Sequence, residues 1–108
     1  MLEFSTDIQN IKKELICRNC KTAMLYHDKV EIFERDEDDE YGLHVVVEDY
    51  NVKVDRDIKN NPSTRRHGLT IYFHCQLCFE RNVLKISQHK GCTELEMGVL
   101  KNKHAADI

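Results

Sequence analysis

The sequence predicts a mainly β domain with one N-terminal helix and a metal site made from four cysteines. Three observations predict it. Two Cys-x-x-Cys steps stand at 17–20 and 75–78, strand-like segments rich in valine and isoleucine lie between and beside them, and a helical apolar pattern precedes the first step. Residues 21–74 therefore form a long β insertion between two parts of one metal site.

Composition limits the chain to one domain with a modest core. Among its 108 residues the charged share is 32% and tryptophan is absent, so a bound metal would add needed stability. No apolar run approaches the roughly 18 residues of a membrane span, and the first residues lack the basic and apolar regions of a signal peptide. We expect a cytoplasmic protein with no membrane partner.

The predicted helix covers residues 5–16. Its apolar stripe consists of Phe4, Ile8, Ile11 and Leu15, at spacings of one helical turn. Thr6 can form a capping box with the glutamine three residues later. We expect the stripe to pack on the sheet near the metal.

The predicted sheet extends over residues 22–97. Its strands follow from alternating or β-branched composition and lie at 22–26, 29–35, 43–54, 69–75, 82–89 and 93–97. His27-Asp28 suits a tight turn, and a change in the alternation phase near Glu48-Asp49 indicates a β-bulge or another tight turn. Residues 1–97 then form a single zinc-stabilised domain, and 98–108 a flexible tail.

The number of strands constrains the topology. An antiparallel chain that leaves the metal at Cys20 and returns at Cys75 makes an even number of crossings. Four separate strands satisfy this condition and would place the acidic loop 34–42 at the metal end. If 22–35 is one strand, either 43–54 folds into its own hairpin or the loop 55–68 crosses the sheet. We favour four separate strands.

The four cysteines suit one structural Zn²⁺ ion per chain. Cys17, Cys20, Cys75 and Cys78 can supply four thiolates in a tetrahedron, which leaves no open coordination position. Iron in a rubredoxin-like site is an alternative, as is redox chemistry. An odd cysteine count without a signal peptide argues against a disulfide scaffold. We expect nearby basic side chains to donate hydrogen bonds to the sulfurs: Arg18, Lys21 and Arg81.

Two Cys-x-x-Cys steps in antiparallel strands, each forming a tight turn called a knuckle, resemble the zinc-ribbon class. The resemblance implies a zinc-ribbon-like antiparallel sheet, with the four cysteines as ligands, although ribbons often have glycine where this chain has Lys21 and Phe79. The run 63–78 together with 88–91 is similar to small uncharacterised zinc-ribbon proteins of bacteria and their phages. That similarity implies no activity.

No set of residues in the sequence suggests catalysis. Cys92 lies close to His89, but no third orienting group and no oxyanion site can be named for a nucleophilic pair. We expect Cys92 to be a buried free thiol. The sequence therefore predicts a protein that is not an enzyme and has no small-molecule substrate.

Charge distribution indicates the candidate binding loops. Residues 34–57 carry ten acidic against three basic side chains, while 58–108 carry eight basic against four acidic. The acidic loop could contact a protein partner through Asp36, Glu37, Asp38, Asp39 and Glu40. We expect a protein-interaction module, for example a phage-type regulator of a host factor. The alternative is a nucleic-acid-binding ribbon that uses Arg65, Arg66 and His67.

The terminal strand offers a further contact. Its edge could pair with a second chain.

Overall fold

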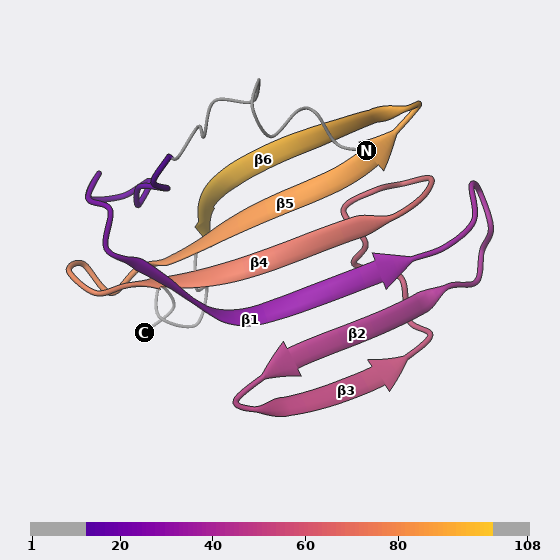
Figure 1. Cartoon of the computed structure of the whole chain (residues 1–108), viewed down its shortest axis with the longest axis horizontal. Coiled ribbons are helices and arrows are strands. Elements are labelled where there is room, and N and C mark those ends of the chain that lie inside the picture. Colours follow the sequence, from indigo (N-terminus) through magenta and orange to yellow (C-terminus); the bar gives the residue numbers. More distant parts are fainter. Residues whose placement is uncertain (1–12, 101–108) are drawn as a thin grey trace, which may run out of the picture.

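The computed structural model describes residues 13–100, which form one antiparallel six-stranded sheet in the order β3-β2-β1-β4-β5-β6 (Figure 1). The strands are β1 (Leu25–Glu34), β2 (Leu43–Glu48), β3 (Asn51–Asp55), β4 (Gly68–Cys75), β5 (Arg81–His89) and β6 (Cys92–Leu100). Central β1 and β4 lie between two hairpins, β2–β3 and β5–β6. β6 includes residues 98–100, which were expected in the tail.

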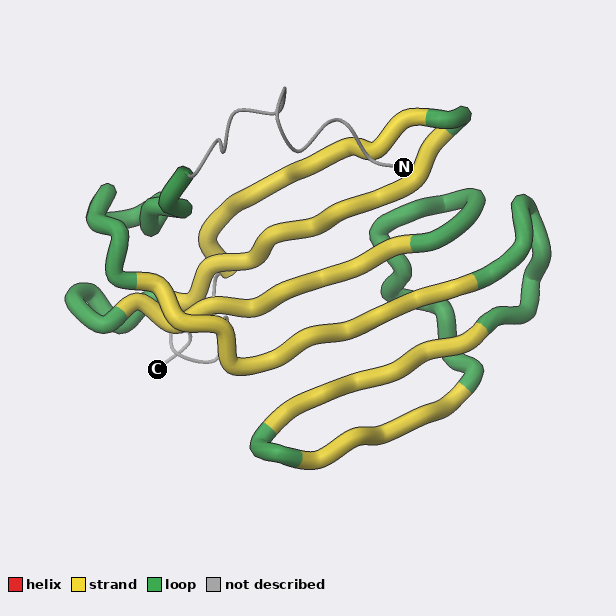
Figure 2. The backbone as a smooth tube through the Cα atoms, viewed as in Figure 1, coloured by secondary structure: helices red, strands yellow, loops and turns green. Residues whose placement is uncertain are grey.

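The predicted fold class, a β domain with one N-terminal helix, was wrong. Residues 13–100 form an all-β structure that contains only strands, turns and loops (Figure 2). The last part of the predicted helix, 13–16, is irregular, and residues 5–12 lie outside the described part. Leu15 belongs to the predicted stripe but is 42% exposed. Since most helical stability comes from packing an apolar face, the exposed side chain of Leu15 gives residues 13–16 little stabilisation as a helix.

The insertion between the knuckles has a different strand pattern from the one favoured. The two segments predicted at 22–26 and 29–35 are the single strand β1, and His27-Asp28 marks a register shift rather than a turn. The segment 43–54 folds into its own hairpin. Asp49 and Tyr50 form its two-residue turn with φ of 54° and 65°, the pair of left-handed residues that a type I′ turn requires.

This pattern corrects the predicted position of the acidic loop. β1 begins next to Cys75 at the metal end and runs away from it, so the loop after Glu34 lies at the opposite end. The loop between β3 and β4 lies there too, and Asp38 donates its backbone N–H to Arg65 O at 2.8 Å. The two candidate binding loops are therefore neighbours, at the end of the sheet opposite the start of β1 (Figure 1).

One face of the sheet is apolar, and we call it the apolar face. Side chains alternate along each strand, so the register defines which residues share a face. Two rows of the apolar face cross all six strands and contain only aliphatic residues. The first row is Val52, Val47, Val30, Ile71, Leu84 and Met97. The second row is Val54, Val45, Ile32, Leu69, Ile86 and Leu95.

The opposite face is mixed in polarity and is partly covered by the loop before β4. A Cβ atom at Gly68 would lie 2.0 Å from Asn61 Oδ1 and 2.8 Å from Pro62 Cδ, so only glycine lets this loop lie against the sheet. Phe33 and Val83 are buried on this face. The small core of the described residues thus lies on this face and at the cysteines.

Candidate metal centre

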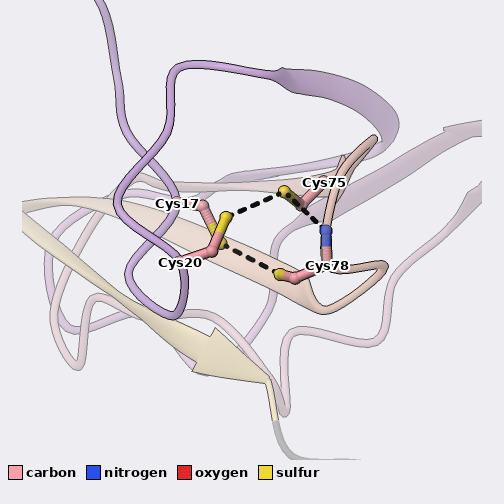
Figure 3. Close-up of side chains that lie close together, drawn as sticks. All are labelled: Cys17, Cys20, Cys75 and Cys78. Atoms are coloured by element: carbon pink, nitrogen blue, oxygen red, sulfur yellow. Dashed lines mark hydrogen bonds between the residues drawn. The ribbon is translucent and has the colours of Figure 1, made fainter.

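The two Cys-x-x-Cys steps fold into two equivalent knuckles at one end of the sheet. In the first, Lys21 N donates to Cys17 O at 2.9 Å; in the second, Phe79 N donates to Cys75 O at 3.1 Å. The knuckles close with bonds from Cys17 N to Thr22 O and from Cys75 N to Glu80 O. Each knuckle thus points its two cysteines toward the other knuckle (Figure 3).

Lys21 and Phe79 occupy the positions where zinc ribbons often have glycine. Their φ values are 66° and 64°, in the left-handed region that glycine adopts most easily. Both positions therefore have the backbone conformation that glycine adopts, although neither residue is glycine. Phe79 gains a compensating contact, because its ring lies 5.8 Å from that of His74.

The four predicted cysteines come together: one sulfur from each of Cys17, Cys20, Cys75 and Cys78 lies within 4.8 Å of all the others. The close pairs join different knuckles, with Cys17 Sγ 3.6 Å from Cys78 Sγ and Cys20 Sγ 3.5 Å from Cys75 Sγ. A disulfide would need about 2.05 Å. Zinc–sulfur bonds of about 2.3 Å in a tetrahedron separate the sulfurs by about 3.8 Å. The four sulfurs are therefore spaced as they would be around one metal ion bound by four thiolates.

Hydrogen-bond donors surround the two fully buried sulfurs. Asn19 N and Asn82 Nδ2 each lie 3.3 Å from Cys17 Sγ, and Cys78 N lies 3.5 Å from Cys75 Sγ. Burial alone would raise the pKa of Cys17, but hydrogen bonds from Cys20 N, the Asn82 amide and Asn19 N lower it to about 6. Amide donors, foremost that of Cys78, also lower the pKa of Cys75. Both sulfurs are prepared to be thiolates, the form that binds metal.

Asn82 is a part of the centre that sequence reasoning missed. It is fully buried on β5, accepts a hydrogen bond from Arg18 N at 2.8 Å and donates to Cys17 Sγ. It thus fastens the first knuckle to the sheet. The sequence offers no signal for this role, because Asn82 and Cys17 are 65 residues apart and meet only in the folded sheet.

Two of the three basic side chains expected beside the sulfurs make other contacts. Lys21 Nζ donates to Arg18 O at 2.8 Å, and Arg81 pairs with Asp28 at 2.7 Å. Only the backbone N–H of Arg18 takes part, through Asn82. Neutral amides therefore replace the expected cations around Cys17.

The predicted acidic and basic loops pair with each other. The Arg65 guanidinium lies 2.8 Å from an Asp38 oxygen and 3.1 Å from Glu37. These carboxylates raise the pKa of Arg65, with the Asp38 hydrogen bond as the largest cause. His67 accepts a hydrogen bond from Arg35 N on Nδ1. Arg65 therefore already has an acidic partner within the chain, and nucleic-acid binding by this loop stays a prediction.

The other predicted loop residues lie around this pair. Asp36, Asp39 and Glu40 are exposed, as is Arg66. Cys92 is also exposed, at the turn between β5 and β6, so the prediction of a buried thiol was wrong. The turn itself consists of Lys90 and Gly91, whose φ values of 50° and 81° are those that a type I′ turn requires.

A second polar cluster crosses four strands on the mixed face. His44 Nε2 lies 2.8 Å from Glu31 Oε1, His44 Nδ1 lies 2.8 Å from Asp55 Oδ1, and Tyr72 donates to Glu31 Oε2 at 2.5 Å. The His44 ring also stacks on Phe33. The only hint in the sequence was one histidine within a valine-rich segment.

Comparisons with known proteins give no relative for this chain. No protein-family model matches it, and neither curated proteins nor solved structures provide a match. The part of the chain that the structure describes has no helix of the length and apolarity needed to cross a membrane. The likeness to zinc ribbons therefore rests on the four cysteines and the backbone of their knuckles.

Proposed function

We propose that this chain is a non-catalytic protein-interaction module whose fold is held by one structural Zn²⁺ ion. The observation that carries the metal assignment is the cluster of four cysteine sulfurs within 4.8 Å, contributed by two equivalent knuckles. A set of four thiolates leaves no coordination position for water or substrate. The ion would serve to hold the two ends of the insertion together.

The interaction role is supported by the sheet itself. Protein domains usually bury each sheet face against a second layer. Among residues 13–100 the first knuckle covers the apolar face only at its metal end, where it bonds to Asn82, and the two aliphatic rows have no second layer. Exposed apolar surfaces of this extent are typical of sites that bind another macromolecule. A protein partner suits this face better than a nucleic acid, because the two aliphatic rows offer no cation to a phosphate.

Metal content tests the first half of the proposal. Protein purified without chelator should contain one zinc ion per chain by elemental analysis. A folded protein with no metal and four titratable free thiols besides Cys92 would contradict the metal assignment.

Removal of a ligand tests the role of the ion. Cys75→Ser should unfold the domain and abolish stoichiometric zinc, because structural sites of this kind contribute on the order of 10 kcal/mol to folding. Cys92→Ser is the matched control, since Cys92 is exposed and outside the cluster, and its circular dichroism and melting curve should equal those of the wild type. An unchanged melting curve for Cys75→Ser would count against the proposal.

A further inference from the structure

In the part of the chain that the structure describes, no second layer covers the two aliphatic rows of the apolar face. The first knuckle covers only the metal end of that face, where it bonds to Asn82. At its two edges Val54 is 59% exposed and Leu95 is 68% exposed. Figure 1 shows the sheet as a single layer, with the hairpins β2–β3 and β5–β6 extending it on either side of the central pair. Two adjacent rows of aliphatic side chains thus form a continuous surface across all six strands.

The two faces differ in charge as well as in cover. Lys53, Lys85 and Glu96 belong to the mixed face, while no charged side chain interrupts the two aliphatic rows. Charged residues near the apolar face occur beyond these rows, at the strand ends. An interface without charges cannot select a different partner by electrostatic complementarity, and two copies of it can meet without burying an unpaired charge.

We propose that a second copy of this chain covers the apolar face, so that two sheets pack face to face about a twofold axis. The inference rests on the proposed interaction module and names its partner. Sheets that pack in this way lie about 10 Å apart, with their inner side chains interdigitated. A twofold arrangement needs only one self-complementary surface, which the aliphatic rows provide.

The size of the face suits a stable dimer. Six strands spaced by about 4.8 Å make it about 29 Å wide, and the part of each strand beyond the row of Asn82, about six residues, makes it about 20 Å long. The product, about 580 Å², is close to the roughly 600 Å² per partner at the lower end of interfaces of standard size.

Residues 1–12 and 101–108 are too few to cover this face. A segment of twelve residues covers about 200 Å² whether it is extended, about 40 Å by 5 Å, or helical, about 18 Å by 10 Å. Both segments together would leave about two fifths of the open face uncovered. A second sheet of the same dimensions would cover it completely.

The experiment combines molar mass with a matched pair of substitutions. Leu84 and Lys85 are neighbours on β5 that point to opposite faces of the sheet. The zinc-loaded wild type and Lys85→Glu should have the mass of two chains by sedimentation equilibrium. Leu84→Glu should have the mass of one chain, because the new carboxylate would be buried in the interface. A wild type that is monomeric, or a Leu84→Glu variant that is still dimeric, would overturn the proposal.

A second measurement needs no variant. In a sample that mixes methyl-labelled with unlabelled chains, intermolecular NOEs should reach the methyl groups of Ile71 and Leu84. A dimer whose intermolecular NOEs come only from the outer edge of β6 would overturn the proposal in favour of edge pairing. A monomer in which residues 1–12 contact Ile71 would overturn it in favour of the chain's own segment.

Zinc content is measured on the same samples, so the two proposals fail separately. A monomer with one zinc per chain removes the second copy but keeps the metal site. A dimer without metal removes the metal site but keeps the second copy.

Discussion

Asn82 connects the metal centre to the sheet at a single fully buried side chain. Its carbonyl oxygen accepts the N–H of Arg18, and its amide nitrogen donates to a sulfur of the cluster. Alanine at this position would leave the Arg18 N–H without a partner and the Cys17 thiolate with one donor fewer. Buried groups that lose their partners cost about 1–3 kcal/mol each.

We therefore predict that Asn82→Ala weakens zinc binding and lowers stability. Loss of such an outer hydrogen bond reduces metal affinity by about 10- to 100-fold, and a competition titration with a chromogenic chelator would measure it. The control is Gln76→Ala, since Gln76 is exposed on the second knuckle and should leave the affinity unchanged. Equal affinity of Asn82→Ala and the wild type would show that the amide only fills space.

His44 joins three strands through hydrogen bonds to two carboxylates, of which Glu31 is largely shielded from water and Asp55 is 36% exposed. Its side chain is 12% exposed and lies between Glu31, 9% exposed, and Asp55. Burial alone would lower the pKa of His44, but the hydrogen bonds to Glu31 and Asp55 outweigh it and raise that pKa above its ordinary value of 6.5. The hydrogen bond from Asp57 N, followed by that to His44, lowers the pKa of Asp55 below its ordinary 3.8.

These two directions define a pH window. A raised histidine pKa gives stability that is complete below about pH 6.5 and is lost as the pH rises through the raised value. A lowered aspartate pKa gives stability that is present above about pH 4 and is lost as the pH falls. The cluster should therefore stabilise the sheet most between about pH 4 and 6.5.

We predict that His44→Gln destabilises the protein by about 1–3 kcal/mol near pH 5.5 and by less as the pH rises toward 9. Urea unfolding curves at several pH values measure the difference. His27→Gln provides the control, because His27 is exposed on β1 and should give no such trend. A difference that grows with pH would mean that His44 is neutral in the folded state.

Much of the strand content could be predicted from the sequence, because alternation along 69–75 and 82–89 is a local signal. The order of the strands around β1 could not be predicted from the sequence. A register shift at His27 and a true turn have the same polar residues, and only the pairing with β4 distinguishes them. That ambiguity moved the acidic loop to the wrong end of the predicted sheet.

The metal centre was predictable for a different reason. Two Cys-x-x-Cys steps together supply the four ligands of one metal site, so the sequence alone indicates that they meet, whatever the length of chain between them. Asn82 was not predictable, because nothing near it in sequence marks it as a neighbour of Cys17. The pairing of Arg65 with Asp38 likewise depends on two loops that meet only in the folded sheet.

The whole molecule has little apolar core in the part that the structure describes. Only Cys17, Phe33, Cys75 and Val83 are buried hydrophobic residues there, and two of these belong to the metal cluster. A single-layer sheet buries too little apolar surface to be stable on its own. If a second copy provides the missing layer, folding and association are one process.

Such coupling makes the melting temperature depend on protein concentration. A dimer that unfolds to two separate chains is stabilised by mass action. When a metal buffer holds the free zinc concentration constant, the stability of a monomer does not depend on its concentration. With an unfolding enthalpy of about 0.7 kcal/mol per residue, Tm should rise by about 3 °C for each tenfold increase in the concentration of zinc-loaded protein. Calorimetry over a hundredfold range resolves this slope, and Lys85→Glu should reproduce it because its side chain belongs to the mixed face. A Tm that is constant over that range would mean that the metal and the mixed face alone stabilise the sheet, with the apolar face left open to water.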